Sequence, residues 1–520
     1  GNFIGMTITE LQQQYAAHPN MAVMKRLLKD TSVQTVFCGG LCASAASLFS
    51  SVLVQEGGCP FVFILGDLEE AGYFYHDLTQ ILGTERVLFF PSSFRRSIKY
   101  GQKDAANEIL RTEVLSRLQK GEEGLCIVTY PDALAEKVVS RKELSNKTLK
   151  LNVGEKVDTT FITDVLHSYG FEYVDYVYEP GQYAVRGSII DVFSFASEYP
   201  YRIDFFGDEV ESVRTFEVES QLSREKKDGV SIVPDLAVTG DVTTSFLDFI
   251  PKETTLAMRD FLWLRERIQV VHDEALTPQA IAVQEAEENG GITLEGKLID
   301  GSEFTVRALD FRRLEFGNKP TGTPNASVTF NTSAQPIFHK NFDLVASSFK
   351  DYLEKGYSLY ICSDSMKQTD RIKAIFEDRG DKINFTPVER TIHEGFVDNT
   401  LRLCIFTDHQ LFDRFHKYNL KSDKARSGKV ALSLKELNQF TPGDYVVHTD
   451  HGIGRFSGLV RIPNGDTTQE VLKLVFQNED VVFVSIHSLH KVSKYKGKEG
   501  EAPRLNKLGT GAWEKLKERT

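Results

Sequence analysis

Residues 443–458 read GDYVVHTDHGIGRFSG, and this stretch decides the fold of the C-terminal part of the chain. Its glycines stand where a backbone bends or is approached closely, while the β-branched and aromatic residues between them favour extended strands. The same pattern continues through LVRI (459–462), EVLKLVF (470–476) and VVFVSI (481–486), with turn signals between the segments. Four or five short strands within about 45 residues predict a small SH3- or Tudor-like β-barrel over residues 438–498. Such a barrel holds no catalytic constellation and is typical of a docking module.

Toward the N-terminus, residues 7–150 alternate helical patterns with short, fully apolar strands. Four such strands are TVFCGG (35–40), FVFILG (61–66), VLFFP (87–91) and LCIVTY (125–130). Because strands of this kind are buried on both faces, they predict a parallel sheet covered by helices. Residues 239–334 are of mixed character, and we expect them to complete this first α/β domain.

The remaining segments change character several times. Residues 151–238 are β-rich, with a hairpin turn at Gly207-Asp208, and are inserted into the first domain. Residues 335–425 return to a small α/β domain, because the helical pattern FDLVASSFKDYLEKG is followed by the strands SLYICS and LRLCIFTD. Residues 426–437 are charged and poor in large apolar side chains, which predicts a linker. Residues 499–520 begin a helix that the chain end cuts short, so we expect a fragment of a longer protein.

Composition bounds the function. With 520 residues, 41% of them hydrophobic, the chain is long enough for several domains. A net charge of −12 argues against strong nucleic-acid binding, since phosphate contacts need clustered lysines and arginines. The six cysteines form no CxxC pair, so we expect thiols in a reducing compartment and a cytoplasmic protein. No apolar run reaches about 18 residues, so we expect no membrane-spanning helix.

Two segments resemble a known family. GDYVVHTDHGIGRFSGL (443–459) is similar to the RNA-polymerase-interacting module shared by CarD-type regulators and bacterial transcription-repair coupling factors. EPGQYAVRGSIIDVFSFASEYPYRIDFFGDEVESVRTF (179–216) resembles the UvrA-binding domain common to UvrB and the coupling factors. Found together in this order, the two segments resemble the N-terminal region of the coupling factors.

This resemblance implies a UvrB-like, helicase-type parallel sheet whose nucleotide site is degenerate. It also implies two partners, the β subunit of RNA polymerase and UvrA, with DNA bound only weakly or through a motor outside this chain. The parent protein would be an ATP-dependent DNA translocase whose ATP and Mg²⁺ bind that absent motor. We therefore expect a fragment with no catalytic residues and no cofactor of its own, which acts as a binder.

A strand–loop–helix unit near the N-terminus resembles a nucleotide-binding P-loop that lacks two of its motif residues. The frame G-x-x-x-x-G-K-[ST] falls on residues 40–47, where Gly40 and Ser47 match but Ala45 and Ala46 replace the second glycine and the lysine. From the residues alone, an ordinary tight turn that opens a helix explains the stretch at least as well. The resemblance favours a decayed P-loop, and neither reading predicts ATP hydrolysis. The alternative function is a UvrB-like, nucleotide-dependent DNA repair ATPase that acts through this loop.

The β-rich segment offers a candidate docking surface. In YRIDFF (201–206), the period of two places Arg202, Asp204 and Phe206 on one face, and Arg186 joins that face if its strand pairs with this one. An aromatic side chain with two arginines is typical of a protein–protein hot spot. The alternative is that a neighbouring element covers Phe206 and that the arginines pair with nearby glutamates. The resemblance implies that Arg186, Arg202 and Phe206 contact UvrA.

In the predicted barrel, we expect an exposed strand at Leu459, Val460, Arg461 and Ile462. The resemblance implies that this strand adds to the edge of a sheet in the RNA polymerase β subunit. Strand addition takes its affinity from main-chain hydrogen bonds and its specificity from alternate side chains. Ile462 is the candidate apolar anchor, and the alternative is that Ile462 fills the barrel core.

Three other motifs have ordinary structural explanations. The sequence at 272–274, HDE, mimics a helicase metal site, but its helical spacing predicts a surface helix. Asp67 is expected to cap the helix that begins at Leu68. His448 and His451 stand close to Asp450, but we expect no metal there, because a hairpin should place neighbouring side chains on opposite faces.

Overall fold

The computed structural model describes residues 5–93, 105–285, 294–414, 416, 440–464, 467–485, 488, 491–495 and 502–508. The chain forms two compact units, Gly1–Lys147 with Leu236–Leu420, and Thr148–Asp235 with Lys421–Thr520. Parallel and antiparallel sheets occur together with helices, which confirms the mixed α/β, multidomain prediction. In the part of the chain that is described, no helix is long and apolar enough to span a membrane.

The first unit contains a parallel sheet with the strand order β18-β2-β17-β16-β3-β5-β4. Its strands are β2 (Thr35–Gly39), β3 (Phe61–Ile64), β4 (Val87–Phe89), β5 (Cys126–Thr129), β16 (Thr255–Met258), β17 (Arg312–Gly317) and β18 (Ala326–Thr329). The four apolar strands predicted from the sequence are confirmed, and all of them are buried except at the first residue of β2. The last three strands follow the β-rich segment in sequence, so one sheet is built from two separate stretches of chain.

Helices and a small antiparallel pair surround this sheet. The helices are α1 (Ile8–Tyr15), α2 (Pro19–Lys29), α3 (Ala45–Glu56), α4 (Leu68–Leu82), α5 (Ala105–Gln119), α6 (Pro131–Ala135), α7 (Arg141–Asn146), α9 (Leu236–Thr239), α10 (Phe246–Phe249), α11 (Phe261–Ala275), α12 (Pro278–Glu285) and α13 (Gly301–Ala308), and the pair is β6 (Val138–Val139) with β15 (Val242–Thr244). Asp67 caps α4 as predicted, because its Oδ1 accepts a hydrogen bond from the Glu70 amide at 2.8 Å. Residues 272–274 lie in α11, where Asp273 and Glu274 are exposed, which confirms a surface helix.

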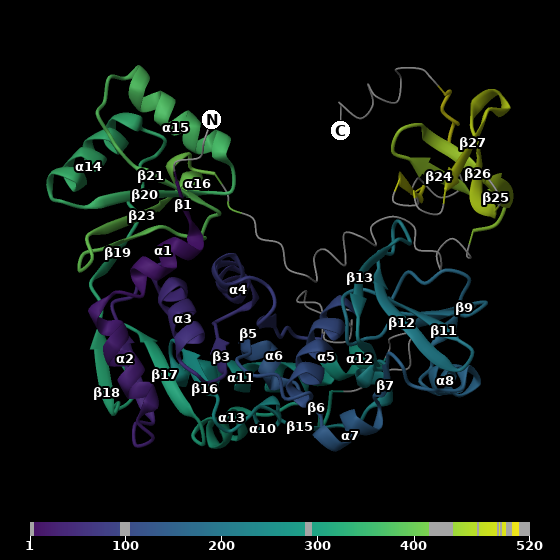
Figure 1. Cartoon of the computed structure of the whole chain (residues 1–520), viewed down its shortest axis with the longest axis horizontal. Helices are drawn as coiled ribbons and strands as arrows, with labels where there is room; N and C mark the ends of the chain where they lie inside the picture. Colours follow the sequence, from purple (N-terminus) through teal and green to yellow (C-terminus); the bar gives the residue numbers. More distant parts are fainter. Residues whose placement is uncertain are drawn as a thin grey trace. The chain divides into compact units, whose positions relative to one another are not determined.

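A second sheet of the same unit has the order β1-β21-β20-β23-β22-β19. Its elements are β1 (Met6–Thr7), β19 (Thr332–Ala334), β20 (Ser358–Ser363), β21 (Thr386–Glu389), β22 (Phe396–Asp398), β23 (Leu403–Thr407), α14 (Phe342–Glu354), α15 (Met366–Asp378) and α16 (Asp408–Leu411). Strand β1 pairs in parallel with β21, so the start of the chain completes a sheet formed mainly by much later residues. Helices α1, α3 and α4 lie between this sheet and the seven-stranded sheet (Figure 1).

The β-rich part of the second unit is a six-stranded sheet with the order β13-β12-β11-β10-β9-β8. Its elements are β7 (Leu149–Asn152), α8 (Thr159–Ser168), β8 (Glu172–Tyr173), β9 (Gln182–Arg186), β10 (Ile189–Val192), β11 (Tyr201–Phe206), β12 (Glu209–Phe216), β13 (Ser223–Lys227) and β14 (Gly229–Ile232), of which β7 and β14 pair separately. The predicted turn at Gly207-Asp208 joins β11 to β12, and Gly207 takes the positive φ of 63° that the tight turn needs. Ile203 and Phe205 face the core with 0% and 3% of their surface exposed, which confirms the predicted alternation of β11.

The C-terminal part is a five-stranded antiparallel sheet with the order β27-β26-β25-β24-β28. Its elements are β24 (Tyr445–His448), β25 (Gly452–Asn464), β26 (Thr467–Val475), the short 3₁₀ helix η1 (Gln477–Glu479), β27 (Val481–Ser485) and β28 (Val492–Lys494). Gly454 is required because a Cβ there would lie 2.9 Å from the ring of Phe476, a core side chain. Closure of this sheet into a barrel stays a prediction. The predicted linker 426–437 lies outside the described residues, as does most of 499–520.

Candidate functional site

The three residues expected to contact UvrA share one face of the β-rich sheet. Strand β10 pairs with β9 and β11, and the register sets Asp191 directly opposite Arg202, and Ile189 opposite Arg186. Phe206 lies on β11 four residues beyond Arg202, an even number, and therefore points to the same side. The strands thus bring together the residues that the sequence suggested.

A buried aspartate fixes the two arginines, and the sequence reasoning did not identify it. Only 1% of the Asp191 side chain is exposed, and its Oδ1 accepts a hydrogen bond from Arg202 Nε at 2.9 Å. Arg186 Nη2 pairs with the other oxygen of the same carboxylate. Arg202 also lies 4.4 Å from the centre of the Phe216 ring. The arginines therefore pair with Asp191 rather than with the glutamates considered earlier, and Arg202 is held in one geometry.

Phe206 is a prominent apolar group on this face. Its exposed fraction is 75%, so no described element covers it, and the alternative of a covered Phe206 does not hold for the described residues. The Arg186 side chain is 42% exposed, whereas that of Arg202 is 18% exposed. Beside the exposed ring of Phe206, Arg186 is therefore the more accessible of the two arginines and Arg202 the less accessible.

The predicted polymerase-binding strand forms the second half of β25. From Leu459 to Asn464 it pairs with β26, but the pairing of β25 with β24 ends at Arg455. Among the described strands, one edge of this half of β25 therefore carries no neighbour, which is what strand addition requires. Leu459 and Arg461 are exposed, while Val460 and Ile462 are half-buried. Ile462 is not part of the core cluster of this sheet, so the alternative that it fills the core is not supported.

The loop that resembles a P-loop connects β2 to α3, and protein groups fill it. The Ser44 amide donates to the Glu394 carbonyl at 3.1 Å, and the Cys42 amide donates to Thr332 Oγ1 at 2.8 Å. Gly40 has a φ of 82°, and a Cβ on it would lie 1.9 Å from the carbonyl oxygen of Phe330. Amides that would face phosphate oxygens in a working P-loop are thus already paired within the chain.

Ser47, in the first turn of α3, contacts the buried carboxylate of Asp77, which belongs to α4. Ser47 Oγ donates to Asp77 Oδ2 at 2.7 Å, and the His393 amide donates to Asp77 Oδ1 at 2.8 Å. Burial raises the pKa of Asp77 to about 6, and these hydrogen bonds moderate the rise. At neutral pH an anionic carboxylate therefore occupies the neighbourhood of the hydroxyl that would hold Mg²⁺. Ala45 and Ala46 are buried, so no side chain of theirs reaches toward a phosphate.

His448 and His451, at the turn between β24 and β25, lie close together, contrary to expectation. The rings of His448 and His451 lie with their centres 4.6 Å apart, and His448 Nδ1 accepts a hydrogen bond from the Asp450 amide at 3.0 Å. The prediction that the hairpin separates these side chains onto opposite faces is wrong, because residues 449–451 form a turn rather than an extended strand.

Two family models match the segments of the chain that carry these surfaces. A family model described as the UvrB interaction domain matches residues 149–237, and one described as the CarD-like/TRCF RID domain matches residues 440–496. A transcription-repair-coupling factor of Staphylococcus aureus (strain bovine RF122 / ET3-1) is 23% identical over 92% of this chain and 46% of its own length. That of Bacillus subtilis (strain 168) is 23% identical over 92% of this chain and 47% of its own length.

The chain is a homologue of the transcription-repair-coupling factors. It spans about half the length of the curated relatives that it matches. The exposed Phe206 lies in the segment that matches the UvrB interaction domain. Strand β25, whose second half pairs with β26 but not with β24, lies in the segment that matches the RID domain.

The Asp191→Asn substitution should loosen the β-rich sheet of this homologue. A neutral amide cannot balance two guanidinium groups, and loss of a buried charge-assisted pair costs about 1–3 kcal/mol. We expect faster amide hydrogen exchange in β9, β10 and β11, measured on the whole chain by mass spectrometry. Glu209→Gln, at an exposed position of the same sheet, is the control. Unchanged exchange in the Asp191 variant would show that the carboxylate does not organise the strands.

Introducing the missing P-loop residues should not create nucleotide binding. In the double variant Ala45→Gly and Ala46→Lys, the loop amides stay paired with residues 332 and 394, and the new lysine begins at a buried position. We expect no saturable binding of ATP with Mg²⁺ at 1 mM in equilibrium dialysis (an affinity of about 4 kcal/mol) for either the parent chain or the variant. Binding by the unsubstituted chain would instead support the ATPase alternative.

Proposed function

We propose that this chain is the adaptor part of a transcription-repair coupling factor, which joins RNA polymerase to the excision-repair protein UvrA. One observation carries the proposal, namely that a UvrB interaction domain and a CarD-like/TRCF RID domain occur in one chain that is homologous to the coupling factors over 92% of its length. Each domain presents a surface suited to protein binding. Coupling then consists of holding two partners on one polypeptide.

The proposed UvrA surface consists of Phe206, Arg186 and Arg202. An exposed aromatic ring supplies apolar area at low entropic cost, because it has only two side-chain torsions to fix. Asp191 preorganises both guanidinium groups, so they lose little freedom on binding. Arg186 retains enough exposure to meet an acidic partner group, whereas Arg202 acts mainly by holding the surface in shape.

The proposed polymerase surface is the edge of β25 from Leu459 to Ile462 that pairs with no described strand, and this edge would add to a sheet edge of the β subunit. Main-chain groups on this edge supply the affinity, and the alternating side chains supply the specificity. Ile462 is half-buried and lies outside the core cluster, which leaves it available as an apolar anchor.

ATP hydrolysis belongs, in this proposal, to the remainder of the parent protein, which would be an ATP-dependent DNA translocase. The filled loop at residues 40–47 supports a binding role for the present chain, with no nucleotide bound at this loop. DNA contact would come mainly through the motor, because this chain carries a net charge of −12. The free cysteines fit a cytoplasmic protein.

Phe206→Ala should weaken binding of UvrA by about 30-fold, which corresponds to the roughly 2 kcal/mol expected for truncating an aromatic hot spot. Biolayer interferometry of the whole chain against UvrA measures this change. Phe161→Ala is the matched control, because Phe161 is also an exposed aromatic residue (54%) of the same domain, placed on α8. Equal affinity of both variants and the parent chain would remove Phe206 from the interface.

Ile462→Arg should abolish saturable binding to the N-terminal region of the RNA polymerase β subunit, because it puts a charge where an apolar anchor is expected. Isothermal titration of the whole chain measures the affinity. The control is Phe483→Arg on β27, an exposed apolar residue (51%) of the same sheet on a different strand. If the control loses binding and Ile462→Arg does not, the polymerase binds at β27 instead.

A further inference from the structure

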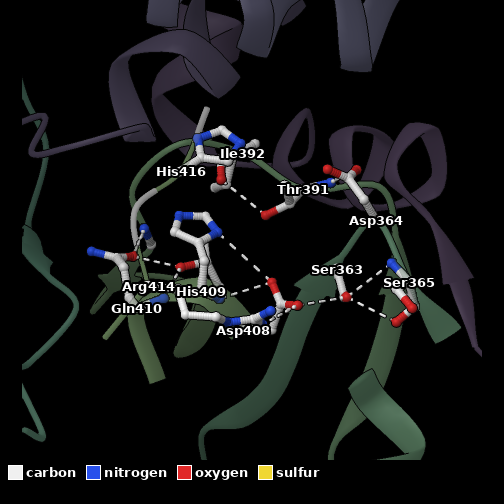
Figure 2. Close-up of polar contacts among 12 residues, drawn as sticks. Ser363, Asp364, Ser365, Thr391, Ile392, Asp408, His409, Gln410, Arg414 and His416 are labelled. Carbon is white, nitrogen blue, oxygen red and sulfur yellow. Dashed lines mark hydrogen bonds and ion pairs between the residues drawn. The ribbon is translucent and has the colours of Figure 1, made fainter. Parts of the chain in front are cut away.

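Four histidines gather in the first unit, although they come from distant parts of the sequence. His393 precedes β22, His409 lies in α16, His416 follows that helix, and His76 belongs to α4. One potential ligand atom of each of His393, His409 and His416 lies within 4.8 Å of those of the other two. The His76 ring centre is 5.0 Å from that of His416. Figure 2 shows His416 next to His409, with Asp408 at the edge of the group.

The hydrogen bonds of these rings resemble the outer contacts of metal-binding histidines. His409 Nε2 lies 2.6 Å from the carbonyl oxygen of His393 and donates to it, and His393 Nε2 lies 3.4 Å from Glu394 Oε1. In metal sites, the ring nitrogen that does not bind the ion donates to such a carbonyl or carboxylate oxygen, which fixes the ring. His409 Nδ1 lies 3.7 Å from Asp408 Oδ1, and His393 Nδ1 is hydrogen-bonded to His416 Nδ1, so an ion bound to either nitrogen would replace one of these contacts.

The spacing of the nitrogens fits one small ion. His393 Nδ1 and His416 Nδ1 are hydrogen-bonded at 3.0 Å, and an ion bound to both would take the place of the shared proton. Two nitrogens bound to a tetrahedral Zn²⁺ at about 2.0–2.1 Å would stand roughly 3.3 Å apart. His409 and His416 are stacked, with ring centres 4.4 Å apart and planes at 11°. Parallel rings do not aim their lone pairs at one point, so binding requires one ring to turn about its Cβ–Cγ bond.

Two ring nitrogens of the histidine cluster lack a hydrogen-bond partner in the described part of the chain, which is evidence for a ligand independent of the spacing. His76 Nε2 and His416 Nε2 are both buried, and neither has a hydrogen-bond partner among the described residues. Buried polar atoms are normally paired, and those that are not call for an unseen water, ion or ligand.

We propose that His393, His409 and His416 bind a divalent transition-metal ion of the Zn²⁺ class, with His76 as the fourth ligand. An all-imidazole set suits Zn²⁺, Ni²⁺ and Cu²⁺ rather than Mg²⁺ or Ca²⁺, which prefer oxygen. A closed set of four protein ligands is typical of structural metal sites. The ion would fasten α4 to the residues around β22 and α16, and it would therefore stabilise the packing of the second sheet against the first domain.

The test uses the whole chain without a histidine tag, treated with EDTA and dialysed into metal-free buffer at pH 7.5. Isothermal titration with ZnCl₂ should give one site per chain with a Kd below about 1 µM. Co²⁺ should give the visible absorption bands of a tetrahedral ion. Binding weaker than about 100 µM, or an octahedral Co²⁺ spectrum alone, would overturn the proposal.

Variants locate the ion. His416→Gln and His76→Gln should each weaken Zn²⁺ binding at least 10-fold, as loss of a ligand does. The matched control is the double variant His448→Gln and His451→Gln, which removes another pair of neighbouring histidines and should leave the affinity unchanged. Loss of binding in the control alone would place the ion in the C-terminal sheet and overturn the proposal. Thermal melts in EDTA identify any variant that fails to fold, and for such a variant the other substitution decides.

Discussion

The first unit depends on the hydrogen bonds that join the loop after β2 to the segment before β22. The Ser44 amide donates to the Glu394 carbonyl, and the Glu394 amide donates back to Ser44 Oγ at 3.0 Å. Beside them, Asp77 accepts from both Ser47 and His393. These bonds satisfy loop and helix-end amides that would otherwise be buried without partners. The same bonds occupy amides that a phosphate would need, so the contact that joins the two sheets leaves these amides unavailable to a nucleotide.

A carboxylate at the start of a helix can replace an anionic ligand. The N-terminal end of α3 carries the partial positive charge of its aligned amides, and in a nucleotide-binding protein a phosphate balances that charge. Here Asp77 lies within hydrogen-bonding distance of Ser47 in the first turn of α3. Asp77 therefore places a carboxylate close to the first turn of α3, where the partial positive charge of the helix end favours it.

The sequence predicted what depends on local pattern. Apolar runs such as FVFILG identify buried strands because a parallel strand is covered on both faces, and the alternation at Ile203 and Phe205 identifies the core face of β11. Asp191 was missed because its importance follows from strand register, which sets it opposite Arg202. The pairing of Met6 with Val388 and the meeting of His76 with His416 bring together residues far apart in the chain, and no spacing rule reveals such contacts.

The two docking surfaces use different physics, and this difference suits an adaptor. The Phe206 surface is built of side chains held by a buried carboxylate, so its specificity lies in shape and charge. The edge of β25 that pairs with no described strand offers main-chain groups that many extended strands can match, so its specificity must come from the few side chains beside it. Neither proposed surface uses a residue of the filled loop, so neither proposed interaction depends on a nucleotide bound at that loop.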